Sequence, residues 1–307
     1  MKPDTPFDIL VAGEINPDLI LSGNVTPEFG QVEKLVDAAA LTIGSSSAIF
    51  ACGAARLGLN VAFIGLCGDD VFGRFMLDEM SKRGVDVRHV IVRKDRQTGL
   101  SVILNNGIDR AILTHSGLIA DLQASDIADS LLAQARHLHV ASYFLQTKLQ
   151  PDLRALFKRA QSLGLTTSLD TNYDPSEKWI GFDELLAVTN VFLPNEAEAK
   201  SLTGTENAEE AATRLQSKVE ALAIKLGKDG ALGICGSQRV QVESIPVKVV
   251  DTVGAGDSFD AGFMYGYLND WELEKSLRLA CVCGALSTQQ AGGTKGQPTL
   301  EEALKFL

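Results

Sequence analysis

Short apolar segments rich in β-branched residues alternate with segments of helical periodicity along most of this 307-residue chain. The helical segments repeat apolar residues every three or four positions, as one buried helix face requires, and the strand segments are runs of three to six residues. The predicted strands are residues 8–11, 19–21, 61–66, 101–104, 110–113, 137–141, 166–169, 191–193, 222–226, 230–235, 239–244 and 247–250. The predicted helices are 48–57, 72–83, 151–163, 209–219 and a long helix that begins just past residue 256.

The order of these elements predicts an α/β fold with three layers. Strands separated by helices favour a mostly parallel central sheet flanked by helices on both faces. Ligands of such sheets bind at the carboxyl ends of the strands. The strand-rich segments 13–43 and 88–115 interrupt the alternation, so we expect them to form a small β-sheet lid inserted into a single domain, 1–307.

Composition and charge exclude several classes of protein. The formal net charge of −11 disfavours nucleic acid as a partner, because phosphate backbones require basic surface. No apolar run reaches the roughly 18 residues of a membrane span, and the start MKPDTPFDIL lacks the features of a secretion signal. We therefore expect a cytoplasmic protein with no membrane partner. The five scattered cysteines favour core thiols over a metal or redox pair.

The segment DTVGAGDSFDAG, residues 251–262, carries the strongest chemical signal. Gly254 and Gly256 allow a tight turn and a close approach of the backbone to a ligand. The free N–H groups and the dipole of the helix that follows form an anion site. Asp257 lies at its mouth, where a carboxylate can accept the proton of an attacking hydroxyl. Alternatively, Asp257 is only an acid that stabilises the helix start.

This segment resembles the C-terminal signature of the ribokinase-like (PfkB) carbohydrate kinases. The resemblance implies a ribokinase-like fold and an ATP-dependent kinase that uses Mg²⁺. It also implies that Gly254, Ala255 and Gly256 form the anion hole and that Asp257 is the general base. The chain contains neither a P-loop motif nor a dinucleotide-binding glycine motif that could explain the segment instead.

Two N-terminal motifs resemble the substrate-binding segments of the same family. In GEINPD, the resemblance implies that Asn16 and Asp18 bind substrate hydroxyls, although Asn-Pro-Asp also favours a simple turn. In GSSS, it implies that Gly44, Ser45 and Ser46 form the substrate loop, whereas the serines could instead cap the next helix. Here Ser45 replaces a usual glycine and Ile49 a usual asparagine, which leaves the identity of the substrate open.

Further matches concern the nucleotide. Asn195 and Glu198 resemble the family's N-x-x-E, which organises magnesium through water; a plain helix start is the alternative. The resemblance implies that the nucleotide also contacts Lys225, Gly227, Thr252 and Gly292. Carbonyls near Asp251 and in the loop 291–294 would bind a monovalent cation such as potassium. Residues 170–174 resemble sugar-kinase turns that place Asp170 or Asn172 near the phosphates, or form an ordinary turn.

The acceptor follows less directly from the sequence. A fructose- or ribose-like sugar leads. Residues 44–49 contain no lysine or arginine to bind a second phosphate, which disfavours a sugar phosphate, although Arg88, Arg93 or Arg110 of the expected lid could reach one. The alternatives are 2-keto-3-deoxygluconate, a nucleoside, or a catalytically silent protein that binds sugar or nucleotide as a regulator. The resemblance also implies a homodimer joined through the lid.

Overall fold

The computed structural model describes residues 5–172, 174, 178–179 and 182–307. Its main sheet has nine strands in the order β15-β14-β13-β12-β11-β10-β1-β4-β6. Neighbouring strands are parallel from β13 to β6, whereas β14 and β15 are antiparallel. The strands are β1 (Phe7–Ala12), β4 (Val61–Ile64), β6 (Val85–Asp86), β10 (Ala135–Val140), β11 (Thr166–Leu169), β12 (Val191–Phe192), β13 (Ala221–Lys225), β14 (Ala231–Cys235) and β15 (Gln238–Val242). The predicted mostly parallel sheet is confirmed.

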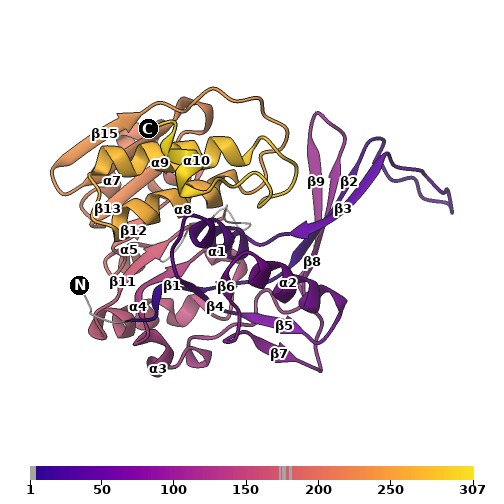
Figure 1. The fold of residues 1–307 in the computed structure, drawn as a ribbon, viewed down its shortest axis with the longest axis horizontal. Helices are drawn as coiled ribbons and strands as arrows, with labels where there is room; N and C mark the ends of the chain where they lie inside the picture. Colours follow the sequence, from indigo (N-terminus) through magenta and orange to yellow (C-terminus); the bar gives the residue numbers. More distant parts are fainter. Residues whose placement is uncertain (1–4, 173, 175–177, 180–181) are drawn as a thin grey trace.

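Helices cover both faces of this sheet and form the three predicted layers (Figure 1). One apolar cluster joins the sheet to α1 (Ser46–Arg56), α2 (Val71–Lys82), α8 (Ala255–Leu268), α9 (Leu273–Ser287) and α10 (Leu300–Leu304). The other joins it to α3 (Asp129–Leu132), α4 (Leu153–Ser162), α5 (Phe182–Leu186), α6 (Glu196–Thr203) and α7 (Ala208–Leu215). Among the described residues, four short 3-10 helices lie in the connections: Ala124–Asp126, Tyr143–Leu145, Gln150–Asp152 and Gly227–Asp229. No helix of the described residues is long and apolar enough to cross a membrane.

A separate four-stranded sheet, which we call the small sheet, projects from the body of the molecule (Figure 1). Its order is β3 (Ala38–Ile43), β2 (Pro17–Ser22), β8 (Leu100–Asn105), β9 (Arg110–His115). These strands lie within the two predicted insertions. However, β7 (Ile91–Arg93) pairs with β5 (Leu66–Gly68) in a third sheet and does not join them.

The register of the small sheet places a polar cross-strand row and an apolar row on opposite faces, because side chains alternate along each strand. One cross-strand row contains Thr42, Asp18, Ser101 and Thr114. The adjacent row, on the opposite face, contains Leu41, Leu19, Val102 and Leu113. The polar row is buried on its two central strands, whereas Leu41 and Leu113 are 38% and 61% exposed.

Two predicted strands differ from the structure. Residues 61–66 divide into β4 and β5 at Gly65, where a side chain would lie 2.4 Å from the carbonyl oxygen of Gly13. The strand predicted at 247–250 is wrong. The N–H groups of Val250 and Asp251 donate to the carbonyl of Thr288 instead of a neighbouring strand, and Val249 and Val250 are more than half exposed.

Candidate active site

The polar residues singled out above meet where the parallel strands end. Asp170 follows β11, Asn195 follows β12 through Leu193 and Pro194, and Lys225 is the last residue of β13. Asn195 and Lys225 form an isolated parallel bridge, which extends the sheet by one residue pair at this edge. Carboxylate, amide and ammonium groups from distant parts of the chain therefore converge, as the strand-end rule predicts.

The glycine loop 254–256 joins an irregular segment to the start of α8. Gly254 has φ of +74°, and a side chain there would lie 2.8 Å from the Cα atom of Gly293. Only glycine satisfies both conditions without strain. The first N–H groups of a helix lack intrahelical partners, so the first turn of α8 presents backbone donors to a ligand.

Asp257 lies in this first turn and is buried. Burial, together with the charges of Asp170 and Glu14, raises the pKa of its carboxyl to about 8, although Lys225 and Ser46 lower it. A carboxyl whose pKa lies near neutrality suits proton transfer. The same burial is costly to the fold, which is typical of functional groups.

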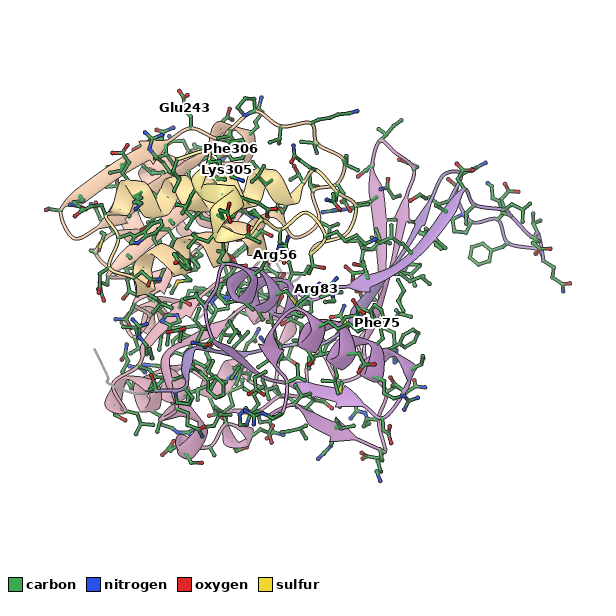
Figure 2. The ribbon with its side chains drawn as sticks, in the orientation of Figure 1. Arg56, Phe75, Arg83, Glu243, Lys305 and Phe306 are labelled. Atoms are coloured by element: carbon green, nitrogen blue, oxygen red, sulfur yellow. The ribbon has the colours of Figure 1, made fainter. Side chains whose placement is uncertain are left out.

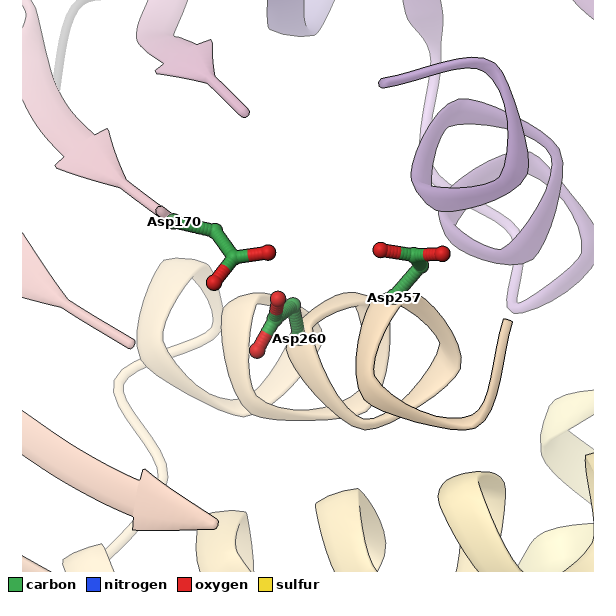
Figure 3. Close-up of side chains that lie close together, drawn as sticks. All are labelled: Asp170, Asp257 and Asp260. Atoms are coloured by element: carbon green, nitrogen blue, oxygen red, sulfur yellow. The ribbon is translucent and has the colours of Figure 1, made fainter. Parts of the chain in front are cut away.

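Asp170, Asp257 and Asp260 form a buried carboxylate cluster (Figure 3). One oxygen from each lies within 4.8 Å of the others. Lys225 Nζ lies 3.0 Å from Asp170 and 3.0 Å from Asp260, so two of the three carboxyl groups share its single positive charge. The pKa of Lys225 is raised because these carboxylates outweigh the opposing effect of burial. The structure thus places Lys225 inside the cluster, and its contact with a phosphate stays a prediction.

Asn195 and Glu198 form a capping box at the start of α6. Each side chain accepts a backbone N–H of the other residue, at 2.9 Å in both cases, and the Asn195 amide donates to Glu198 at 2.7 Å. Burial and the charge of Asp170 raise the pKa of Glu198 to about 7, and Lys225 lowers it. The helix cap, which is the alternative to a role in magnesium binding, is therefore present in the structure, and it lies at the edge of the carboxylate cluster.

The acceptor-binding candidates lie at the base of the small sheet. Asp18 is buried against Gly44, where a side chain would lie 2.2 Å from a carboxylate oxygen. Burial and the charge of Asp251 raise the pKa of Asp18 to about 7 against the lowering effect of Arg110. Asn16 donates weakly to Ser101 at 3.4 Å. Two residues beyond Gly44, Ser46 lies close enough to Asp257 to lower its pKa, which connects this region to the candidate base.

Glu14, which the sequence did not single out, holds the predicted substrate loop. Its carboxylate accepts hydrogen bonds from the hydroxyls of Ser45 at 3.0 Å and Ser47 at 2.6 Å. Ser45 also donates to the Glu14 carbonyl at 2.6 Å and caps α1 by accepting from Ala48. These bonds hold Ser45 at φ of +69°, a conformation that costs a non-glycine residue on the order of 1–3 kcal/mol.

Glu14→Ala is expected to lower the free energy of unfolding by about 1–3 kcal/mol, because the hydroxyls of Ser45 and Ser47 lose their acceptor. Urea unfolding measures this change. Glu206→Ala, at an exposed position, provides the control and should change the free energy little. Equal effects of the two substitutions would contradict a role for Glu14 in holding the loop.

The remaining predicted residues surround the glycine loop. The carboxylate of Asp251 accepts N–H groups of Val253 at 3.0 Å and Gly292 at 2.9 Å, so it ties loop 291–294 to the glycine segment. Thr252 is exposed beside it. Gly227, at φ of +61°, begins the 3-10 helix after β13. Ile49 packs against Gly254 and Gly293, so the position of the family's asparagine is an apolar contact here.

Comparison with known proteins decides the family. Residues 8–300 match the pfkB family carbohydrate kinase model. The chain belongs to the PfkB family. It is 32% identical to the 2-dehydro-3-deoxygluconokinase of Bacillus subtilis, over 84% of each chain. It is 29% identical to the ribokinase of Haemophilus influenzae, over 97% of this chain and 98% of that one.

The fold agrees with this assignment. The structure of Arabidopsis thaliana ribokinase complexed with ribose and ATP superposes with a TM-score of 0.85 at 24% identity, over 98% of both chains. The ribokinase-like fold and the PfkB resemblance are both confirmed. The protein is accordingly an ATP-dependent carbohydrate kinase. The specific roles of its residues remain predictions.

Proposed function

We propose that this PfkB kinase transfers the γ-phosphoryl group of ATP to a hydroxyl of a small fructose- or ribose-like sugar, with Asp257 as general base. The observation that carries the proposal is the buried carboxylate of Asp257 in the first turn of α8, directly after Gly254–Gly256. The base and the backbone donors of one helix terminus thus serve the same transferring group.

The acceptor binds between the small sheet and α8. Asp18 accepts hydrogen bonds from its hydroxyls, and Asn16 can both donate to them and accept from them. A carboxylate and an amide together therefore match a polyol. Ser46 orients the Asp257 carboxylate. Asp257 takes the proton of the attacking hydroxyl while the N–H groups at Gly254–Gly256 stabilise the charge on the phosphoryl group. The small sheet acts as a lid that excludes water, which would otherwise be phosphorylated in place of the sugar.

Magnesium fits the donors at this site, because it prefers oxygen ligands and retains several waters. When bound, the ion neutralises phosphate charge. Glu198 is the residue that would hold it through water, since its carboxylate retains lone pairs beyond the three hydrogen bonds from Asn195 and Thr171. Lys225, Gly227, Thr252 and Gly292 border the nucleotide, and the carbonyls near Asp251 bind a monovalent cation such as potassium.

One observation favours a sugar acid as the second candidate. Arg110, on β9, is close enough to Asp18 to lower its pKa. An arginine beside the acceptor would pair with the carboxylate of 2-keto-3-deoxygluconate. The B. subtilis relative named above carries that activity in its name.

The test is ADP formation with magnesium and potassium across ribose, fructose, 2-keto-3-deoxygluconate and adenosine. We expect one strong acceptor. If a sugar acid alone reacts, the acceptor class is wrong and the second candidate replaces it. If ATP binds but nothing is phosphorylated, the protein is a silent regulator and the proposed function fails.

The pH dependence provides an independent check. With the pKa of Asp257 raised to about 8, the base is protonated below that pH and ionised above it. We therefore expect kcat/KM to rise with pH and level off above about 8, because this ratio reports the free enzyme. A rate that is flat between pH 6 and 9 would contradict Asp257 as the base.

We also propose a homodimer joined through the apolar face of the small sheet. Leu41, Leu19, Val102 and Leu113 form its cross-strand row, and exposed apolar sheet surface favours pairing with a second copy. Light scattering should give twice the mass of the 32.8 kDa chain. Leu113→Lys should shift the mass toward the monomer. Lys228→Gln, at an exposed position outside the small sheet, should not. A monomeric wild-type protein would remove the proposal.

A further inference from the structure

A hollow of about 370 Å³ lies between α1, α2 and the loop 294–297. Three separate segments of the chain contribute its cationic side chains. Figure 2 labels two of them, Arg56 at the end of α1 and Arg83 after the end of α2. Its polar lining residues are Arg56, Lys82, Arg83, Thr294, Lys295 and Gln297.

The positive charge of this hollow is only partly compensated. Glu79 pairs with Lys82 at 2.8 Å and with Arg83 at 2.6 Å, so one carboxylate serves two cations. Glu302 lies 3.8 Å from Arg56. Lys295 forms no ion pair with any described residue. Four cations therefore face two carboxylates, in a chain whose formal net charge is −11.

The chemistry of the lining selects an anion, and phosphate in particular. Arginine presents a planar fork of N–H donors that matches phosphate oxygens, and lysine adds a compact charge. Besides the polar residues only Cys52 lines the hollow, which disfavours an apolar ligand. The volume is at the small end of the range for small-molecule sites. Thr294 is buried and its hydroxyl has no hydrogen-bond partner among the described residues, so an anion bound against this loop would offer it an acceptor.

We propose that this hollow binds the phosphate group of a small molecule, either inorganic phosphate or a phosphate monoester. The site is distinct from the candidate active site. Ser46, beside Asp257, begins α1, whereas Arg56 ends it, and a helix of this length spans about 15 Å. The inference goes beyond the proposed function and does not depend on the identity of the acceptor.

Direct contacts connect the hollow to α8, the helix that carries Asp257. Arg56 Nε donates to the carbonyl of Gln297 at 2.5 Å. The Gln297 side chain donates to the Ile49 carbonyl at 2.9 Å and to Ser258 Oγ at 3.1 Å. Ser258 is the residue after Asp257. Occupancy of the hollow therefore acts on groups that hold the first turn of α8.

Calorimetric titration of the full chain with inorganic phosphate, and separately with glycerol 3-phosphate, tests the site. Saturating magnesium and a non-hydrolysable ATP analogue occupy the nucleotide site, so that probe binding there does not contribute. The test variant is Arg83→Gln/Lys295→Gln. The matched control is Lys275→Gln/Arg278→Gln, which likewise removes one lysine and one arginine paired with a glutamate four positions earlier.

We expect the test variant to weaken phosphate binding by at least about tenfold, because it removes two charged donors, and the control to leave binding unchanged. Tighter binding of glycerol 3-phosphate than of phosphate identifies a monoester as the ligand, and equal binding identifies inorganic phosphate. Binding that is the same in the test variant and the wild type, or no binding of either probe at millimolar concentration, overturns the proposal. Because no turnover is measured, this result is independent of the kinase assay.

Discussion

Asp257→Asn is expected to lower kcat by about 10²–10⁴-fold, the contribution of a positioned general base. The amide keeps the shape of the side chain but cannot accept the hydroxyl proton. The substitution should not weaken ATP binding, and it should raise the melting temperature, because it removes a carboxyl whose pKa burial has raised to about 8. Between pH 3.8 and about 8, this carboxyl is protonated in the folded protein but ionised in the unfolded chain. The folded protein therefore loses stability relative to the unfolded chain as the pH rises through this range.

Steady-state kinetics and thermal unfolding above pH 8 measure the two effects. Asp229→Asn is the control, since Asp229 is exposed and lies outside the carboxylate cluster. Loss of activity together with a lower melting temperature would mean that the variant is damaged rather than chemically disabled. Turnover close to the wild-type rate would show that Asp257 is not the base.

Lys225→Met should lower the free energy of unfolding by about 3–5 kcal/mol, the usual cost of removing one partner from a buried ion pair. Methionine fills a similar volume but leaves Asp170 and Asp260 without their shared ammonium, 3.0 Å from each. The side chain of Lys225 is only 12% exposed, so water cannot replace it. Denaturant unfolding measures the loss.

Two further variants separate charge from packing. Lys228→Met, at an exposed position three residues on, should change the free energy by less than about 0.5 kcal/mol. The double variant Lys225→Met/Asp260→Asn should regain part of the loss, because it removes one of the two uncompensated carboxylates. If the double variant is less stable than Lys225→Met by the full effect of Asp260→Asn alone, the ion pair is not the cause.

The local patterns of the sequence predicted the class of fold and singled out Asp257 as the candidate base. Local periodicity, which the sequence displays directly, was enough to predict strands 166–169 and 191–193 and the helix past residue 256. The spacing of Gly254 and Gly256 before an apolar helix likewise defines an anion-binding turn without reference to the rest of the chain. Asp257 followed from its position in that turn.

Asp260 could have been found by the same reasoning. It lies three residues after Asp257, so it must share a face of α8 with it. The sequence could not show that Lys225 Nζ lies between Asp260 and Asp170, because three elements far apart in the chain supply those groups. The order of β11, β12 and β13 in the sheet brings Asp170 and Lys225 together, and the packing of α8 against the sheet adds Asp260.

The sequence by itself thus determined the class of fold, the family signature and the candidate base. The tertiary structure decided which groups share a charge environment: Glu14 with Ser45 and Ser47, and Lys225 with two aspartates. It also overturned the strand at 247–250, whose apolar residues satisfied the local pattern. The physical reason is that a strand requires a partner with free backbone groups, and this segment bonds to the end of α9 instead.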